Sequence, residues 1–319
     1  MRTKFRSHAR LACVISTSAA VALILSACGS SGTGASESPA SATTINGVNV
    51  TINTDAAALL PEQYKRGIRI VTAAPYAPFE YFDANQNLIG LDIDTGNAIA
   101  AVLGTKAEWT SIDYNGVFPA IAAGKYDIVL ASTGDTPERE KVLDFVNYSK
   151  QGQVLLVPAG NPDGIKGLQD MCGKTLAVES GNVTADYFKS LDQHCADSGK
   201  AMMTLKELPK TSDALLAIKS GGASAQYIGV ATAADLKSKS EGAGYEIITP
   251  TDKPFGYLPR WVGVGTPKNA PKLRDAIAAA LKVLVNDGAL EKLYEKYGQQ
   301  KILTGQVEIN KIVDEPLIP

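Results

Sequence analysis

The sequence predicts an α/β protein made of two lobes, and three observations support this. The chain has 319 residues, 45% of them hydrophobic and 20% charged, which is an ordinary globular composition and long enough for two domains or lobes. Apolar runs with the length of buried strands recur along it, for example at 126–131 and 154–157. Other stretches, such as 273–285, place their apolar residues at helical spacing.

The first 27 residues have the pattern of a secretory signal. A basic segment precedes the apolar segment 11–25, and Leu25-Ser26-Ala27-Cys28 matches the lipobox of bacterial lipoproteins. The alternative is a membrane-spanning helix, but the 15 residues of 11–25 fall short of the roughly 20 that a bilayer core requires. We therefore expect a lipid on Cys28 and a protein held at the extracellular face of the cell membrane.

Residues 28–55 are predicted to be the lipidated cysteine and a flexible tether. Most of the segment 29–44 is Gly, Ser, Ala and Thr, a composition that cannot bury a core. Removal of the basic signal leaves a mildly acidic chain, which gives no electrostatic footprint for nucleic acid.

The cysteines suggest one disulfide. Once Cys13 leaves with the signal and Cys28 carries lipid, Cys172 and Cys195 remain as an even pair in an exported protein. Two buried free thiols are the alternative. We expect no metal site, because only His194 adjoins Cys195 and the sequence shows no other ligand cluster.

The folded part is expected to begin near Tyr64. Residues 67–72 predict a strand and 73–81 a rigid loop beyond its end, where open α/β sheets bind ligands. Asp92 and Asp94 precede a helical run, and we interpret them as helix-start residues that accept from free N–H groups rather than as a metal or acid–base pair.

The stretch 109–145 holds the clearest candidate for a binding site. A strand-like run opens into the small polar segment 132–136, and Arg139 follows. A guanidinium beside exposed backbone N–H groups suits a planar carboxylate, because it can donate two parallel hydrogen bonds. The structural alternative is a buried ion pair of Arg139 with Glu138 or Asp135.

The second half of the chain shows the same mixture of patterns. Strands are expected at 154–157, 175–178 and 225–230, and helices at 208–220, 273–285 and 290–297. The tail 300–319 carries no readable chemistry.

These pieces resemble, in order and spacing, the amino-acid-type solute-binding proteins of bacterial ABC importers, family 3. The resemblance covers about residues 60–300 and is carried by Trp109, 113–116, 119–121, 124–127, 136–139 and 142–145. It implies a periplasmic-binding-protein-like fold of type II, in which a two-strand hinge joins two α/β lobes and the ligand cleft lies between them. Lobe 1 would comprise residues 56–150 and 260–319, and lobe 2 residues 151–259.

The resemblance also implies a set of lobe 1 ligand residues. Arg139, with Ser132 and Gly134, would hold a carboxylate. Tyr76 and Tyr114 would cover the body of the ligand, although packing in the core is an equal alternative for either aromatic ring.

From lobe 2, Asn182 and Val183 would lend backbone amides at a helix start. Glu179 would lie beside the ligand side chain, or would remain an exposed or capping residue. The chain departs from the family at Gly229, where relatives usually carry an acidic residue that binds the ligand's ammonium group. A free ammonium on the ligand is therefore not implied.

We expect a monomeric, lipid-anchored receptor that captures a small amino-acid-like or other carboxylate-bearing metabolite by lobe closure and delivers it to an ABC permease. The expected partners are this small molecule, the permease subunits and the membrane, with no nucleic acid. The sequence shows no phosphate loop, metal motif or nucleophile constellation, so we expect neither a cofactor nor an enzyme. The alternatives are a dehydratase of the same fold, with Glu179 as its available general acid, and a ligand-sensing protein for a signalling receptor.

Overall fold

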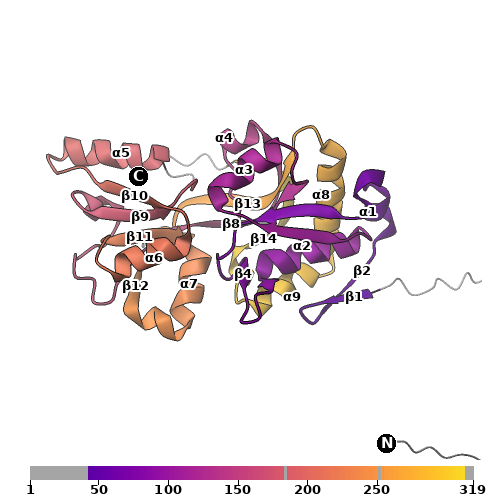
Figure 1. The fold of residues 1–319 in the computed structure, drawn as a ribbon, viewed down its shortest axis with the longest axis horizontal. Helices are drawn as coiled ribbons and strands as arrows, with labels where there is room; N and C mark the ends of the chain where they lie inside the picture. The colour runs from indigo at the N-terminus through magenta and orange to yellow at the C-terminus, as the bar shows by residue number, and fades with distance from the viewer. Residues whose placement is uncertain (1–41, 183–184, 251–252, 254, 313–319) are drawn as a thin grey trace, which may run out of the picture. The chain divides into compact units, whose positions relative to one another are not determined.

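The computed structural model describes residues 42–182, 185–250, 253 and 255–312 (Figure 1). The predicted signal, Cys28 and Val183 lie outside these residues. A search of the described segments finds no helix long and apolar enough to cross a membrane.

Lobe 1 is built around three parallel strands, β3 (Ile68–Thr72), β6 (Ala107–Ser111) and β7 (Ile128–Val129). β3 lies between the other two and pairs with both. Its neighbouring residues Ile70 and Val71 point to opposite faces of the sheet and are both buried, as expected for an apolar strand covered on both faces. The helices of this lobe are α1 (Thr54–Ala58), α2 (Leu91–Val102), α3 (Tyr114–Ala122), α4 (Pro137–Glu140), α8 (Pro271–Asn286) and α9 (Ala289–Lys296).

Two long antiparallel strands, β8 (Leu143–Pro158) and β13 (Tyr257–Pro267), run from one lobe to the other. Gly265 of β13 pairs with β7 in lobe 1, whereas β8 pairs with lobe 2 strands beyond Gly152. All of these strands therefore belong to one mixed sheet that is continuous through β8 and β13.

Lobe 2 repeats the α/β pattern. β9 (Thr175–Glu179) pairs in parallel with β10 (Thr204–Leu208) and β11 (Ala225–Gly229), and β12 (Tyr245–Ile248) runs antiparallel to β8. The helices are α5 (Ala185–Asp197), α6 (Thr211–Lys219) and α7 (Val230–Ser238) (Figure 1). Short 3-10 turns lie at Glu62–Tyr64, Leu168–Met171, Ser240–Gly244 and Gln300–Ile302.

The buried apolar residues separate into clusters that follow the two lobes. In lobe 1, Leu91 and Ile99 of α2 pack with Leu281 of α8. In lobe 2, Leu155 and Tyr227 belong to a different cluster. The lobe boundaries at 150/151 and 259/260 stay predictions, because residues near them lie within the continuous strands β8 and β13.

The predicted disulfide between Cys172 and Cys195 is present, with the two Cα atoms 5.5 Å apart. It fastens the C-terminal part of α5 to the segment that precedes β9. Cys195 is fully buried, so the bond belongs to the interior of lobe 2.

The predicted tether is too long at its C-terminal end. β1 (Ala42–Ile45) and β2 (Val48–Thr51) form a hairpin, and Ile45, Val48 and Val50 are buried in the lobe 1 core. The apolar residues of this segment alternate in sequence, which is the signal that would have identified the strands.

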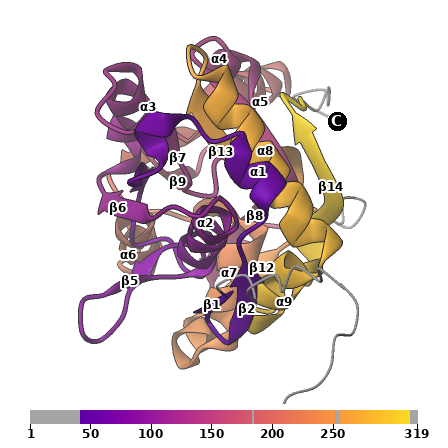
Figure 2. The ribbon, with the colours of Figure 1, turned by 90° about the vertical axis from the view of Figure 1, so that its right-hand side faces the viewer.

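The tail also has more structure than its sequence suggested. β14 (Leu303–Ile309) pairs antiparallel with β8 and lies beside α8 (Figure 2). A small hairpin of β4 (Tyr81–Phe82) and β5 (Leu88–Ile89) completes the described strands.

Candidate functional site

Arg139 is positioned by a short turn that its own sequence encodes. Pro137 begins α4, and the Thr136 side chain caps this helix by accepting from the Arg139 N–H at 3.3 Å. The preceding loop is fixed to β13, because the Asp135 N–H donates to the Trp261 carbonyl at 2.7 Å. The backbone of Arg139 is therefore held near the carboxyl end of β7 by a capped helix start and a loop that is hydrogen-bonded to β13.

The Arg139 guanidinium is buried but has no carboxylate partner among the described ion pairs. It donates to the Gly134 carbonyl at 2.7 Å and to the Gly181 carbonyl at 3.4 Å. Its Cζ lies 4.6 Å from the ring centroid of Phe118 and 5.6 Å from that of Tyr114. Aromatic faces and carbonyls orient this cation without neutralising it, so it retains the charge that an anion needs.

A pocket adjoins this guanidinium and receives residues from both lobes. Of the predicted ligand residues, seven line it: Tyr76, Tyr114, Ser132, Gly134, Arg139, Glu179 and Asn182. The eighth, Val183, lies outside the described residues.

Tyr76 reaches from lobe 1 to the start of α7 in lobe 2. A Cβ atom built on Gly229 would collide with the Tyr76 hydroxyl oxygen. The Tyr76 phenol from lobe 1 therefore occupies the space that a side chain at position 229 would need. Burial raises the Tyr76 pKa, so the hydroxyl stays neutral at physiological pH.

Two buried carboxyl groups of lobe 1, Glu80 and Asp92, form an acidic part of the site. Glu80 lines the pocket, is 1% exposed, and its Oε2 has no hydrogen-bond partner in the described structure. Asp92 lies behind it and accepts from the Ser132 N–H at 2.5 Å. Burial raises the pKa of Glu80 well above its usual range, with the neighbouring Asp92 and Glu179 charges adding to the effect. Burial also raises the pKa of Asp92 to about 7.

Asp92 and Asp94 lie in the first turn of α2, as predicted, but they do not cap its free N–H groups. α2 has Gly90 at its N-cap, with no side-chain capping bond. Asp92 instead supports the ligand loop through Ser132, and Asp94 accepts from the Tyr297 hydroxyl at 2.7 Å.

Glu179 supplies the acidic group of lobe 2. Its Oε1 accepts from the Thr211 N–H at 3.2 Å, at the start of α6, while the residue lines the pocket. Burial raises the Glu179 pKa to about 7, although the Thr211 bonds oppose the shift. Glu179 therefore accepts from the start of α6, as a capping residue does, and also lines the pocket. The two interpretations that the sequence left open for this residue are compatible.

The connecting strands contribute residues that the sequence did not single out. Gln151 and Gln153 of β8 and Arg260 of β13 all line the pocket. Gln151 donates to the Ser132 hydroxyl at 2.5 Å, while its Oε1 and that of Gln153 are buried without a partner in the described structure. Gln151 and Gln153 are two positions apart, so their side chains lie on the same face of β8. The sequence alone does not show where this face lies, because the register of β8 depends on partner strands that are distant in the chain.

Within the described residues no group of three or more His, Cys, Asp or Glu side chains could hold a metal ion. The polar atoms of the pocket are suited to an organic ligand with an anionic end and a hydrogen-bond-donating end. Arg139 suits the first, and the oxygens of Glu80, Gln151 and Gln153, which lack partners in the described structure, suit the second.

Known proteins share this architecture. A sequence model of the bacterial extracellular solute-binding proteins, family 3, matches residues 68–300. The arginine-binding extracellular protein ArtP of Bacillus subtilis (strain 168) is 27% identical over 237 residues, which are 74% of this chain and 88% of that relative.

Two solved structures are also similar. An ancestral arginine-binding protein bound to arginine has a TM-score of 0.66 at 33% identity and covers 74% of this chain and 100% of its own. The ancestral amino acid-binding protein AncCDT-1, a precursor of cyclohexadienyl dehydratase, has a TM-score of 0.62 at 30% identity and covers 72% of this chain and 94% of its own. These similarities confirm the predicted periplasmic-binding-protein-like fold of type II.

Proposed function

Because the chain belongs to family 3 of the bacterial extracellular solute-binding proteins, we propose that it is the receptor of an ABC importer for an amino-acid-like solute, with arginine as the leading candidate. The receptor closes its lobes on the solute and delivers it to the permease. Cys28 anchors it to the membrane through lipid.

The observation that carries this proposal is a buried, unneutralised arginine in a pocket shared by two lobes. Arg139 is 7% exposed and pairs with no described carboxylate. A ligand carboxylate would accept two of its N–H groups and gain more from the loop amides. Since Gly181 of lobe 2 already touches the guanidinium, such a ligand favours the closed arrangement.

Other residues of the pocket favour a ligand with a second, donor-rich end. Glu80, Gln151 and Gln153 offer three acceptor oxygens that lack described partners. A guanidinium presents five N–H donors, so it satisfies several acceptors at once, and ionised Glu80 or Glu179 would balance its charge. The names of similar proteins, which include arginine binders, agree with this choice.

Calorimetric titration with L-arginine tests the proposal directly. We expect one site per chain and thermal stabilisation that grows with ligand, roughly 2.7 kcal/mol at 100 times Kd. Titration with the other amino acids and with 4-guanidinobutanoate, which lacks the α-ammonium, locates the true ligand class. If the protein binds none of these carboxylate-bearing compounds, the receptor assignment is wrong.

The lipid anchor needs a separate experiment. In the native host or a related bacterium, wild-type protein should sediment with membranes, and a Cys28→Ala variant should not. Recovery of both proteins in the same fraction would count against anchoring through Cys28.

A second candidate function is a dehydratase, and Glu179 is the observation that favours it. Its buried carboxyl has a pKa raised to about 7 and lines the pocket, as a general acid requires. AncCDT-1, one of the similar structures, is named as a precursor of such an enzyme. Prolonged incubation with prephenate or arogenate separates the two functions. An aromatic product that accumulates over many turnovers supports the enzyme, and stoichiometric retention supports the receptor.

A further inference from the structure

The C-terminal strand β14 lies beyond the part of the chain that matches the family. The family match ends at residue 300, and β14 begins at Leu303. β14 pairs with β8, with Leu303 opposite Ser149 and Ile309 opposite Val146. The segment therefore adds a third strand beside the two strands that connect the lobes.

Asn310 fastens the end of β14 to the start of β8. Its Oδ1 accepts from the Phe145 N–H at 2.8 Å, and its own N–H donates to the Phe145 carbonyl at 3.1 Å. Its Nδ2 donates to Asp144 Oδ1 at 3.1 Å. The φ angle of 53° at Asn310 lies in the left-handed region, which asparagine tolerates better than most residues.

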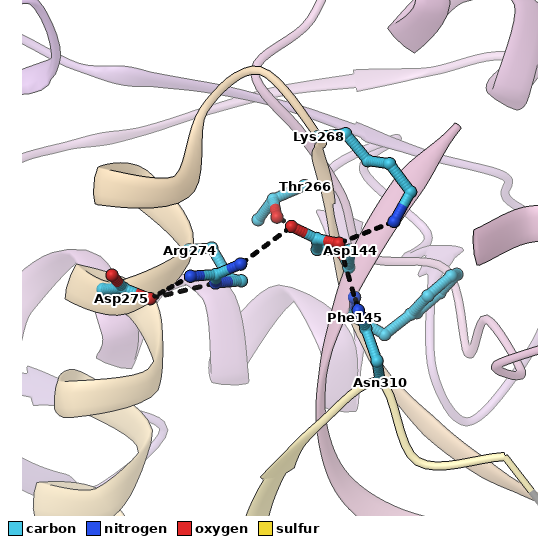
Figure 3. A network of polar contacts seen from close by, with 7 residues as sticks. All are labelled: Asp144, Phe145, Thr266, Lys268, Arg274, Asp275 and Asn310. Carbon is cyan, nitrogen blue, oxygen red and sulfur yellow. Dashed lines mark hydrogen bonds and ion pairs between the residues drawn. The ribbon is translucent and has the colours of Figure 1, made fainter. Parts of the chain in front are cut away.

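Asp144 extends this attachment to α8 (Figure 3). Its Oδ2 accepts from Arg274 at 2.9 Å and its Oδ1 from Lys268 at 2.9 Å. These partners hold the pKa of the Asp144 carboxyl below its usual range, despite the opposing effect of burial. Asp144, Asn310 and Arg274 thus connect β8, β14 and α8 into one rigid corner of lobe 1.

Lys311, the residue after Asn310, hydrogen-bonds to a buried side chain of β8. The Lys311 N–H donates to Oδ1 of Asn147, a fully buried residue of β8, at 3.0 Å. Thr304, near the other end of β14, donates to the Tyr148 carbonyl at 3.0 Å. The C-terminal segment therefore holds β8 at several points between Phe145 and Ser149.

Farther along β8, this support ends. Val146, Asn147 and Ser149 pair with β13 on one side and with β14 on the other, with a shift in the β14 register between Leu303 and Glu308. Lys150 and Gln151 pair with β13 alone among the described strands. The register of β13 on β8 shifts at this level, between Tyr257 and Arg260, and also between Val262 and Gly263, where β14 covers the other side of β8. Between the part of β8 that β14 holds and the part that β11 pairs with from Gln153 onward, residues 150–152 have no second partner strand among the described strands. This stretch carries Gln151 of the pocket, and the Gly152 N–H donates to the Phe255 carbonyl at 2.8 Å.

We propose that β14 and Asn310 form a brace that fixes the lobe 1 end of the connecting strands and confines the bending between the lobes to residues 150–152. This inference rests on the proposed function, because it concerns closure of the same pocket. When bending is confined to 150–152, Gln151 moves each time the lobes open. The brace therefore couples the open–closed equilibrium to the position of Gln151 in the pocket wall. Without it, bending spreads into 146–149 and more open conformers become populated.

The test compares Asn310→Ala, just after β14, with Gln306→Ala at an exposed position within β14. Spin labels at Lys125→Cys in lobe 1 and Lys219→Cys in lobe 2 report the distance between lobes without ligand. We expect a broader, longer distance distribution and at least about 10-fold faster amide exchange at 145–149 in Asn310→Ala. Gln306→Ala should match wild type.

Thr304→Val provides a second, milder variant, since it removes only the hydroxyl bonds of β14. It should give the same changes at smaller size, and the Kd for arginine should rise by several-fold in both brace variants. A folded Asn310→Ala or Thr304→Val protein with the wild-type distance distribution would overturn the brace. If wild type binds no arginine, the proposed ligand is wrong, but the ligand-free distance measurement still decides the brace.

Discussion

Nη2 of Arg139 in lobe 1 lies 3.4 Å from the carbonyl oxygen of Gly181 in lobe 2. The side chain that faces the anion is thus also a contact between the lobes. Its loss should therefore affect ligand binding and closure together.

Arg139→Lys should weaken arginine binding by about 100-fold or more, because an ammonium cannot replace the two parallel N–H donors of a guanidinium. Calorimetry measures the loss. Arg69→Lys is the matched control, since Arg69 pairs with Asp127 away from the pocket and its replacement should leave Kd unchanged. Equal affinities for wild type and Arg139→Lys would remove Arg139 from the site.

Glu80→Gln should discriminate between charged and neutral ligands. The amide keeps the shape but cannot balance a guanidinium, so arginine affinity should fall by about 10-fold to 100-fold. Citrulline, whose ureido group is neutral, should lose far less. Glu108→Gln, at an exposed position outside the pocket, serves as the control. Parallel losses for the two ligands would show that Glu80 does not face the side-chain end.

Arginine affinity should rise as pH increases from about 5.5 to 8. Asp92 and Glu179 have pKa values raised to about 7 by burial, so both are largely protonated at the lower pH. A cationic ligand favours their charged forms, and binding near neutral pH should release protons. Titration in buffers of different ionisation enthalpy measures this release. Affinity that falls with increasing pH would contradict the assignment.

Gly229→Ala should weaken ligand binding by roughly 10-fold, because the new Cβ collides with the Tyr76 hydroxyl. Tyr76→Phe in the same protein should restore part of the affinity, since it removes the atom in collision. Gly244→Ala is the control in lobe 2, where a Cβ meets no atom within 4 Å. If Tyr76→Phe gives no recovery, the two residues do not meet in the closed protein.

The sequence identifies those parts of the site that are local in the chain. Arg139 follows Thr136 and Pro137 within one turn, and helix-capping rules alone bring its backbone to the carboxyl end of β7. Glu80 and Asp92 are different, because their contact depends on how a loop folds back onto a helix 12 positions later.

Long-range pairing explains the remaining differences. Gln151 of β8 and Arg260 of β13 are paired, although more than 100 residues separate them in the chain. Local sequence patterns do not reveal a pairing over this distance. In β14 the apolar residues Leu303, Val307 and Ile309 alternate with polar ones, and this pattern would have indicated a strand. The pattern does not identify its partner, because β8 lies more than 130 positions earlier in the chain. Chain ends and connecting strands are thus the parts of this fold that sequence patterns describe least well.

Removal of the disulfide by Cys172→Ala with Cys195→Ala should lower the free energy of unfolding of lobe 2 by on the order of 3 kcal/mol. The bond closes a loop with a sequence separation of 23, and the larger freedom of the unfolded chain favours unfolding once it is absent. The loop includes β9, which ends at Glu179, and most of α5, which follows Asn182. Chemical denaturation of wild type and variant measures the change, and wild type treated with a reducing agent should match the variant. Arginine affinity at low temperature should remain close to wild type, because the bond lies outside the pocket lining. Equal unfolding midpoints for the oxidised and variant proteins would show that the disulfide does not contribute to the stability of lobe 2.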